Sequence, residues 1–299
     1  MNRDILITVI LPVFNGEKYL VEAIESILNQ TYENFEFIII NDGSKDGTLE
    51  IIEKYKKQDS RILLISRENR GLVESLNEGL GLAKGKYIAR MDADDISERS
   101  RFENQLEIME NNKLDVVGSH FIVIDDDGVK QQAVFMPIKE ELISLQFLDT
   151  VPVAHPSVMI NREFLLKHKL SYKDISTEDY YLWSEMYRLG AKFSNCDDFL
   201  FYYRNNSNSF SRSKQKEMKK DKKIILNNFF GKNKESIFES IKLISLKYEN
   251  YTAYEKDIFI KAISYIVIKK YYFSNIRKYI KCLRVKDFYK ILSYLKSIS

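Results

Sequence analysis

The stretch Tyr87-Ile88-Ala89-Arg90-Met91-Asp92-Ala93-Asp94-Asp95 decides the fold prediction for this chain. Its first half has the composition of a short buried strand, and three aspartates follow within four residues. A buried carboxylate is costly unless it is paired or bound to a cation. Aspartates are also common in loops and helix caps, so the group alone is weak evidence for a binding site. Its meaning depends on the segments before and after it.

Strands and helices alternate around this stretch. Apolar runs predict strands at 5–11, 35–40, 61–66 and 85–89, and amphipathic spacing predicts helices at 17–29, 48–57 and 71–83. Continuous β-branched runs fit strands buried on both faces of a parallel sheet. The alternation predicts a doubly wound α/β sheet, whose ligands bind at the carboxyl ends of the strands. Because Asn15, Asp42 and Asp92 each follow such an end, the sequence predicts that they share one site.

Further elements follow the aspartates. The pattern predicts a helix at 101–111, strands at 115–124, 130–135 and 158–161, and a helix at 178–189. Asp125–Gly128 forms the predicted turn of a hairpin between the first two of these strands. The turn lacks the later ligands of a calcium loop, so a solvated acidic turn is the better interpretation.

Charge divides the chain. Residues 1–211 carry 24 basic and 35 acidic side chains, whereas residues 212–299 carry 22 basic and 8 acidic ones. This shift predicts a domain boundary near 207–214, with a ligand-binding domain at 1–211 and a basic helical region at 212–299. The sequence leaves the oligomeric state open.

Compartment signals are few. Cys196 and Cys282 are far apart and lack metal-ligand spacing, which favours a reducing compartment. The apolar run from Ile5 stops at Pro12, so no signal peptide is predicted. No apolar stretch approaches the roughly 18 residues of a membrane span. We therefore expect a cytoplasmic protein.

Six short motifs occur in order along the chain: Val9-Ile10-Leu11-Pro12-Val13-Phe14-Asn15, Asn41-Asp42-Gly43-Ser44-Lys45-Asp46-Gly47-Thr48, Asn69-Arg70-Gly71, Asn77-Glu78-Gly79, Asp92-Ala93-Asp94-Asp95 and Glu178-Asp179. With these motifs the chain resembles the family 2 glycosyltransferases of bacterial polysaccharide assembly over roughly residues 5–211. This resemblance implies a GT-A fold, which is Rossmann-like with a mostly parallel sheet and flanking helices. It also implies an inverting transferase that uses a nucleotide-diphosphate sugar and a divalent metal, Mn²⁺ or Mg²⁺.

The donor site follows from the resemblance. Asp42 would accept the N–H of a uracil edge, which makes a UDP-sugar the expected donor; a turn-forming role beside Gly43 is the alternative. Arg70 would approach the base or the phosphates, although an isolated basic residue is more often a solvated charge. The complete set of expected donor-binding residues is Pro12, Val13, Asn15, Glu17, Asp42, Arg70, Asp92 and Ala93.

The expected metal ligands are Asp94 and Asp92. Two carboxylates separated by one residue can both face a hard cation, which compensates their charge. The cation would neutralise charge developing on the diphosphate. Asp92 would also touch the ribose, and Asp95 would support the pair or cap the following helix.

Asp179 is the expected general base. An inverting displacement needs a proton acceptor on the face opposite the leaving group. The helix dipole lowers the pKa of a carboxylate in a first turn, whereas burial and neighbouring Glu178 raise it. Thr177-Glu178-Asp179 is also a good capping sequence, which is the structural alternative.

Four residues have weaker expected roles around the acceptor or the metal: Glu178, His155, Trp183 and Asn206. Trp183 and Tyr180 would stack on an acceptor sugar or pack in the core. His155 would serve the acceptor or be a buried structural histidine. Relatives often have Tyr-Arg-x-His after the base helix, and Asn206 stands where that histidine would be. Because an amide binds metals more weakly than imidazole, the third metal ligand stays open.

The basic region 212–299 has three interpretations. It would form a helical bundle on the catalytic domain, attach peripherally to an anionic membrane near a lipid-linked acceptor, or bind nucleic acid, which we do not expect. Its most apolar run, 258–268, is too short to span a bilayer.

The leading functional hypothesis is a metal-dependent inverting glycosyltransferase acting on a saccharide or lipid-linked saccharide. A nucleotidyltransferase would need a glycine-rich basic loop near the first strand, which is absent from the sequence. The remaining alternative is a non-catalytic sugar-nucleotide-binding or scaffold protein.

Overall fold

A computed structural model describes residues 4–206, 215–268 and 280–283, together with residues 287, 290, 291 and 293. Packing divides the chain into two compact units. The first unit comprises residues 1–136 and 153–221, and the second comprises residues 137–152 and 222–299. This division differs from the expected boundary at residue 211 in two places. The segment 137–152 belongs with the C-terminal helices, and the helix that begins at Gln215 starts in the first unit.

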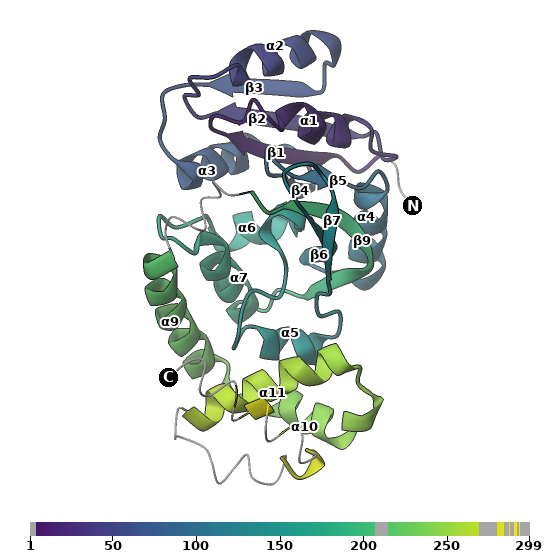
Figure 1. Ribbon diagram of the computed structural model, residues 1–299, viewed down its shortest axis with the longest axis vertical. Coiled ribbons are helices and arrows are strands. Elements are labelled where there is room, and N and C mark those ends of the chain that lie inside the picture. Colours follow the sequence, from purple (N-terminus) through teal and green to yellow (C-terminus); the bar gives the residue numbers. More distant parts are fainter. Residues whose placement is uncertain are drawn as a thin grey trace. The chain divides into compact units, whose positions relative to one another are not determined.

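Four parallel strands begin the first unit (Figure 1). Strand β1 (Ile7–Val13) pairs with β2 (Phe35–Asn41) and β4 (Tyr87–Arg90), and β2 pairs with β3 (Ile62–Ser66). The connecting helices are α1 (Leu20–Leu28), α2 (Thr48–Gln58) and α3 (Leu72–Leu82). The predicted strands and helices of this region are confirmed, with their ends shifted by a few residues.

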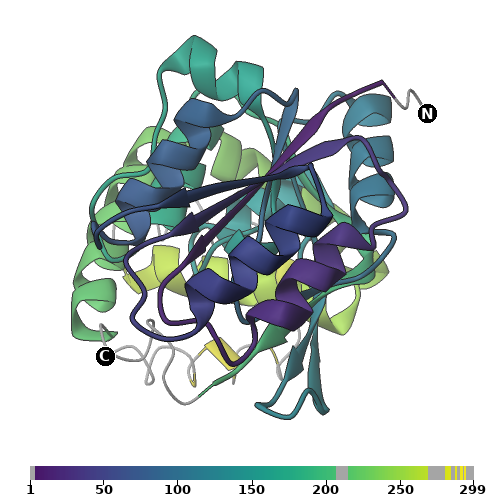
Figure 2. The same cartoon turned by 90° about the horizontal axis from the view of Figure 1, so that it is seen from above.

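Helices cover both faces of these strands, as Figure 2 shows from above. Val9 and Leu11 belong to the core cluster that also contains residues of α1 and α4 (Arg101–Asn112). Ile10, on the opposite face, contacts α3, where a Cβ at Gly79 would lie 2.6 Å from its Cγ2 atom. The period-two alternation of a strand thus packs one helix layer on each face.

The second half of the sheet is mixed. The full strand order is β3-β2-β1-β4-β8-β6-β9-β5, and β7 pairs with β6. Pairing is antiparallel for β4 with β8, β6 with β8, β6 with β7 and β5 with β9, but parallel for β6 with β9. These strands are β5 (Ile96–Ser97), β6 (Val116–Ile124), β7 (Lys130–Val134), β8 (Met159–Asn161) and β9 (Phe193–Arg204). The expected parallel sheet therefore holds for four strands, and the predicted β6–β7 hairpin is confirmed.

The remaining helices of this unit include one that was predicted. Helix α7 (Glu178–Arg188) confirms the expectation, whereas α6 (Arg162–His168) and the short 3₁₀ helix His155–Ser157 were not predicted. Strand β9 was not predicted either. Its register with β6 shifts around residues 197–200, where Asp197 and Asp198 interrupt the apolar alternation. A bulge of this kind hides a strand from period-two patterns.

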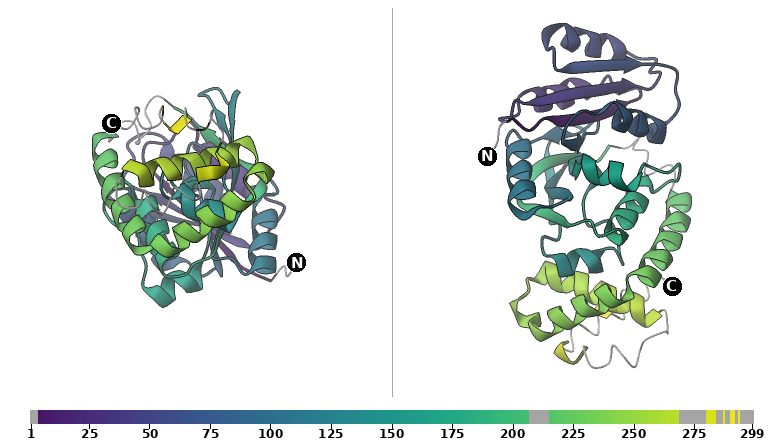
Figure 3. Two further views of the ribbon diagram at one scale, coloured as in Figure 1. Left: turned by 90° about the horizontal axis from the view of Figure 1, so that it is seen from below. Right: turned by 180° about the vertical axis from the view of Figure 1, so that it is seen from behind.

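The second unit is helical. It contains α5 (Glu140–Gln146), the C-terminal part of α9 (Gln215–Lys232), α10 (Lys234–Leu246), α11 (Ala253–Ile268) and the 3₁₀ helices Tyr248–Asn250 and Ile280–Cys282 (Figure 3). Phe147 stacks on Phe229 with ring centroids 4.4 Å apart, and the Ser144 hydroxyl donates to Ser240 Oγ over 2.8 Å. These contacts place the inserted segment 137–152 in this core.

The apolar run at 258–268 lies inside this core. Ile258, Phe259 and Ile263 are at most 3% exposed. These side chains pack inside the unit rather than on its surface. Among the described residues, none of the helices combines the length and hydropathy needed to cross a membrane.

Candidate active site

The loops after β1 and β2 are fastened to each other by side chains expected to bind the donor. Asn15 has a left-handed backbone (φ 52°), and its Oδ1 accepts a hydrogen bond from Lys45 N over 2.8 Å. Its own N–H donates to Ser44 Oγ over 2.9 Å. Glu17 Oε2 accepts from Gly47 N over 2.9 Å. Asn15 and Glu17 thus shape the strand-end loops, and their contact with a donor stays a prediction.

Asp42 holds the next loop in place, the one that connects β3 to α3. Its carboxylate oxygens accept from Arg70 N and Gly71 N, each over 2.8 Å, and the group forms an ion pair with Arg67. Arg67 also pairs with Glu78 over 2.7 Å. Asp42 thus fastens the loop after β3, a structural role that differs from the turn-forming role expected beside Gly43, and recognition of a base stays a prediction. Arg67 was missed in the sequence because a basic residue at a strand end carries no distinctive pattern.

The aspartate loop, Asp92–Asp95, follows β4. The buried guanidinium of Arg90 forms an ion pair with Asp92. Asp94 Oδ2 accepts from Asn206 Nδ2 over 2.6 Å, and buried Asp95 accepts from Arg204 N over 2.7 Å. One carboxylate oxygen from each of the three aspartates lies within 4.8 Å of the others. Asp95 therefore ties the loop to β9 and does not cap a helix.

The electrostatics of the aspartate loop fit a divalent cation. Burial, followed by the charge of Asp92, raises the pKa of Asp94 to about 6. The same causes raise the pKa of Asp95 well above its usual value. Asp95 Oδ2 is buried and has no hydrogen-bond partner among the described residues. Because oxygen ligands suit Mn²⁺ and Mg²⁺, the carboxylate set matches the expected cofactor.

The buried side chain of Arg204 supports the aspartate loop. Its side chain is 1% exposed, and its Nε donates to the carbonyl oxygen of Asp94 over 2.8 Å. Its Nη1 donates to the carbonyl oxygens of Asp125 and Asp126 over 3.0 and 3.1 Å, and its Nη2 pairs with Glu22 over 2.6 Å. One guanidinium thus links α1, the aspartate loop and the β6–β7 turn. The sequence signal for it was only its place two residues before Asn206.

The acidic pair, Glu178 and Asp179, begins α7. Asp179 Oδ1 accepts from Tyr180 N over 2.7 Å, and Glu178 lies 3.7 Å from Nδ1 of His155. Burial, followed by the charge of Asp179, raises the pKa of Glu178 to about 7. Burial also raises the pKa of Asp179. Of the opposing effects expected at this helix start, burial is therefore the larger.

One cleft of about 300 Å³ brings the two acidic groups together. Arg90, Asp92 and Asp94 contribute to its wall, as do His155, Glu178 and Asp179, which are more than sixty residues further along the chain. Leu72, Pro156, Ser176, Tyr203 and Met218 complete the lining. The predicted donor residues Pro12, Val13, Asn15, Glu17, Asp42, Arg70 and Ala93 do not line this cleft. Arg70 lines an adjacent cavity instead.

The structure distinguishes between the acceptor-side and the structural roles expected for His155 and Trp183. His155 is buried, lies 2.9 Å from the Tyr172 hydroxyl through Nε2, and keeps a lowered pKa because of burial and nearby Arg90. It is a neutral wall of the cleft. Trp183 is completely buried and meets the His155 ring edge-on at 5.9 Å. Of the two alternatives for Trp183, the burial of the indole supports packing in the core.

A parallel half-sheet of nucleotide-binding type, continued by a mixed half-sheet and carrying an acidic loop opposite an acidic pair, defines the class of GT-A glycosyltransferases. A family model described as glycosyl transferase family 2 matches residues 8–169. This match spans more than half of the chain, which belongs to that family.

Similar sequences are also described as glycosyltransferases, and solved glycosyltransferase structures share the fold. An uncharacterised glycosyltransferase of Methanocaldococcus jannaschii is 38% identical over 223 residues, covering 71% of this chain and 76% of that one. Glycosyltransferase GlyG of Streptococcus pneumoniae is 30% identical over 222 residues, covering 70% and 73%. Staphylococcus aureus TarS 1–349 in complex with UDP-GlcNAc superposes with a TM-score of 0.60 at 18% identity, covering 97% of this chain and 79% of that one.

A second solved structure is similar to the same extent. The mannosyltransferase PcManGT from Pyrobaculum calidifontis, in complex with GDP-Man and Mn²⁺, gives a TM-score of 0.57 at 15% identity and covers 95% and 87%. At such low identity both structures establish the GT-A fold alone.

Proposed function

We propose that this glycosyltransferase moves a hexosyl or N-acetylhexosaminyl group, with inversion, from a UDP-sugar to a hydroxyl of a saccharide or lipid-linked saccharide. The observation that carries the proposal is the single cleft shared by the aspartate loop and the acidic pair. An inverting displacement needs a site for the diphosphate and, across the sugar, a proton acceptor. The cleft has carboxylates suited to both tasks.

In this proposal the aspartate loop binds the diphosphate of the donor. Asp94 and Asp92 would hold a divalent cation, which neutralises charge on the leaving diphosphate when bound. Arg204 and Asn206 keep Asp94 in place through its carbonyl and carboxylate oxygens. Arg90 orients Asp92 through their ion pair. These contacts hold two carboxylates toward one point before the donor arrives, which reduces the reorganisation that binding requires.

Asp179 takes the proton of the acceptor hydroxyl. Its carboxylate lines the cleft, is fixed by Tyr180 N, and has a pKa raised by burial, which strengthens it as a base. Glu178 is held against His155 and has a pKa of about 7, so a large fraction of it is protonated at neutral pH. We assign Asp179 the base role and Glu178 a supporting one.

The cellular setting belongs to the same proposal. TarS was solved with UDP-GlcNAc and PcManGT with GDP-Man and Mn²⁺, so nucleotide sugars occupy this fold in both. We place the reaction in cell-surface polysaccharide synthesis on the cytoplasmic side of the membrane. The second unit exposes Leu243 and Leu246 beside Lys242 and Lys247, a combination suited to an anionic surface.

The test is a donor screen. UDP-, GDP- and dTDP-sugars are compared by thermal stabilisation with Mn²⁺, and the best donor is then followed for hydrolysis by liquid chromatography. We expect one nucleotide to stabilise the protein and its sugar to be released. Stabilisation without hydrolysis or transfer would favour the scaffold alternative, and no stabilisation by any donor would overturn the proposal.

A further inference from the structure

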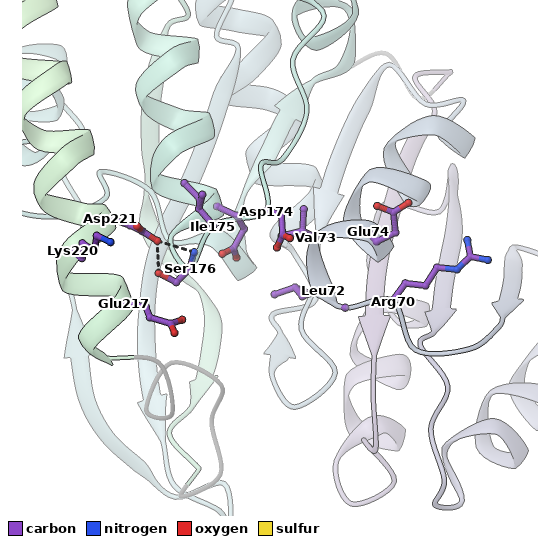
Figure 4. Close-up of a pocket in the computed structure, with 12 residues that line it drawn as sticks. Arg70, Leu72, Val73, Glu74, Asp174, Ile175, Ser176, Glu217, Lys220 and Asp221 are labelled. Carbon is purple, nitrogen blue, oxygen red and sulfur yellow. Dashed lines mark hydrogen bonds between the residues drawn. The ribbon is translucent and has the colours of Figure 1, made fainter.

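A second cavity, of about 530 Å³, adjoins the cleft within the first unit. Figure 4 shows its three walls: residues 70–74 at the start of α3, residues 174–176 of the loop before α7, and Glu217, Lys220 and Asp221 on α9. The cavity and the cleft share Leu72, Ser176 and Glu178. A ligand that reaches the acidic pair from this side therefore enters through the cavity.

The cavity lies on the side of the acidic pair that an acceptor requires. Asp92, Asp94 and Arg90 line the cleft but not the cavity. In an inverting displacement the attacking hydroxyl approaches the sugar opposite the diphosphate. Since the aspartate loop marks the diphosphate end, the acceptor should extend away from that loop, past Glu178. The cavity occupies this direction.

The far wall is fixed to the loop that carries the acidic pair. Asp221 Oδ2 accepts two hydrogen bonds from Ser176, one from its N–H over 3.1 Å and one from its hydroxyl over 2.7 Å. These bonds, drawn in Figure 4, hold the start of α9 against residues 174–178. Two of the three walls of the cavity are thus joined by hydrogen bonds.

The lining is acidic. Glu74, Asp174 and Glu217 face the cavity, and none of them has an ion-pair partner among the described residues. Lys220 and Arg70 are the two cations of the lining, and assigning this cavity to the acceptor replaces the donor role expected for Arg70. The uncompensated carboxylates repel an anionic group and attract an amino group, with a strength that salt reduces.

We propose that this cavity binds the acceptor saccharide, and that Glu74, Asp174 and Glu217 select neutral or amino-bearing acceptors against carboxylated or phosphorylated ones. The proposal rests on the proposed glycosyltransferase function. It adds the acceptor class and the residues that determine it. Charge at a partly exposed site changes affinity by modest factors, so we expect roughly tenfold discrimination.

The experiment uses three probes with matched rings: octyl β-glucoside, octyl β-glucosaminide and octyl β-glucuronide. Their dissociation constants are measured by NMR titration of the full chain loaded with UDP and Mn²⁺. We expect the glucuronide to bind at least about tenfold more weakly than the glucosaminide, with the glucoside between them. Equal binding, a reversed order or no binding of any probe in the millimolar range would overturn the proposal.

Charge reversal provides the second measurement. In Glu74→Lys/Glu217→Lys the order of the three probes should reverse. The matched control is Glu53→Lys/Glu235→Lys, which makes the same charge change at exposed positions outside the cavity and should keep the wild-type order. Should the reversed variant unfold, Glu74→Gln/Glu217→Gln replaces it and should remove the preference. An unchanged preference in the folded variant counts against the cavity.

Donor hydrolysis separates the two proposals. Water replaces the acceptor in that reaction, so the cavity variants should hydrolyse the donor at the wild-type rate. Wild-type protein without hydrolysis would reject the proposed function. Normal hydrolysis with no discrimination among the probes would reject only the assignment of the cavity.

Discussion

The aspartate loop and the acidic pair are two sets of carboxylate side chains that line the same cleft, but the residues around each set differ. Behind the aspartate loop lie two arginines and an amide, since Arg90, Arg204 and Asn206 all contact it. Beside the acidic pair lies the neutral ring of His155, while Asp179 is held by a backbone N–H. Burial raises the pKa of carboxylates in both groups. The difference lies in their partners, since arginine and amide donors hold the aspartate loop as a set of ligands, whereas Asp179 keeps one backbone donor and faces the cleft. The environment, more than the residue type, separates the two tasks.

The largest expected effect comes from removing a ligand of the aspartate loop. Asp94→Ala should abolish transfer and metal-dependent donor binding, because no other described carboxylate replaces its oxygen in the cluster. Calorimetric titration with UDP, with and without EDTA, measures this. Asp127→Ala, an exposed turn aspartate, is the control and should bind as wild type. UDP affinity in Asp94→Ala that still depends on EDTA would contradict the assignment.

Asp179→Asn tests the other side of the comparison. It should lower turnover about 10²–10⁴-fold through loss of the base, with UDP affinity nearly unchanged. Initial rates and the same titration provide the two readouts. Asp198→Asn, at an exposed position of β9, serves as control. Wild-type turnover in Asp179→Asn would rule out the base role.

Arg204→Met should loosen the aspartate loop, although Arg204 itself does not line the cleft. The guanidinium is buried, so its loss removes the donor to three carbonyl oxygens, those of Asp94, Asp125 and Asp126, and should lower the unfolding free energy by about 1–3 kcal/mol. Affinity for Mn²⁺ should fall as Asp94 loses its support, and Arg204→Lys should restore part of it. Urea unfolding and Mn²⁺ titration measure the two effects. Destabilisation with unchanged Mn²⁺ affinity would reduce Arg204 to a purely structural role.

The smallest expected effect is on the pH dependence of stability. Glu178, with a folded pKa raised to about 7, binds more protons in the folded state than in the unfolded state between its two pKa values. Without metal, stability should therefore be higher near pH 5 than at pH 7.5 and fall as pH rises through that window. Asp94 acts in the same direction, and Mn²⁺ should cancel only its part.

Urea midpoints at the two pH values, with EDTA or Mn²⁺, separate these contributions. The pH dependence that remains with Mn²⁺ should become smaller in Glu178→Gln, while Asp179, whose pKa burial also raises, keeps its own share. Should that variant keep the full slope, Glu178 is not the titrating group. His155 and His120, whose pKa values burial lowers, act in the opposite direction, so the test is the difference between Glu178→Gln and wild type rather than the sign of the total slope.

The local sequence pattern was sufficient to predict much of the fold. Strands β1 to β4 and helices α1 to α3 follow from apolar periodicity, and their alternation placed Asn15, Asp42 and Asp92 at strand ends. The motif order was sufficient for the family, which the comparisons confirm. Strand β9 was not predictable because Asp197 and Asp198 break its alternation at a register shift. The placement of segment 137–152 with the C-terminal helices depends on contacts such as Phe147 with Phe229, which periodicity does not encode.

By itself, the sequence determined which carboxylates this protein offers and at which strand or helix end each one lies. These are local properties, because a strand end and a helix start depend on neighbours in the chain. Only the tertiary structure decided what each carboxylate faces. It brought Asn206 and Arg204 to the aspartate loop across more than a hundred residues, enclosed the acidic pair until its pKa rose, and buried Trp183 out of reach. Partner choice and burial arise from packing between distant segments, and these two properties give the same residue type two different functions.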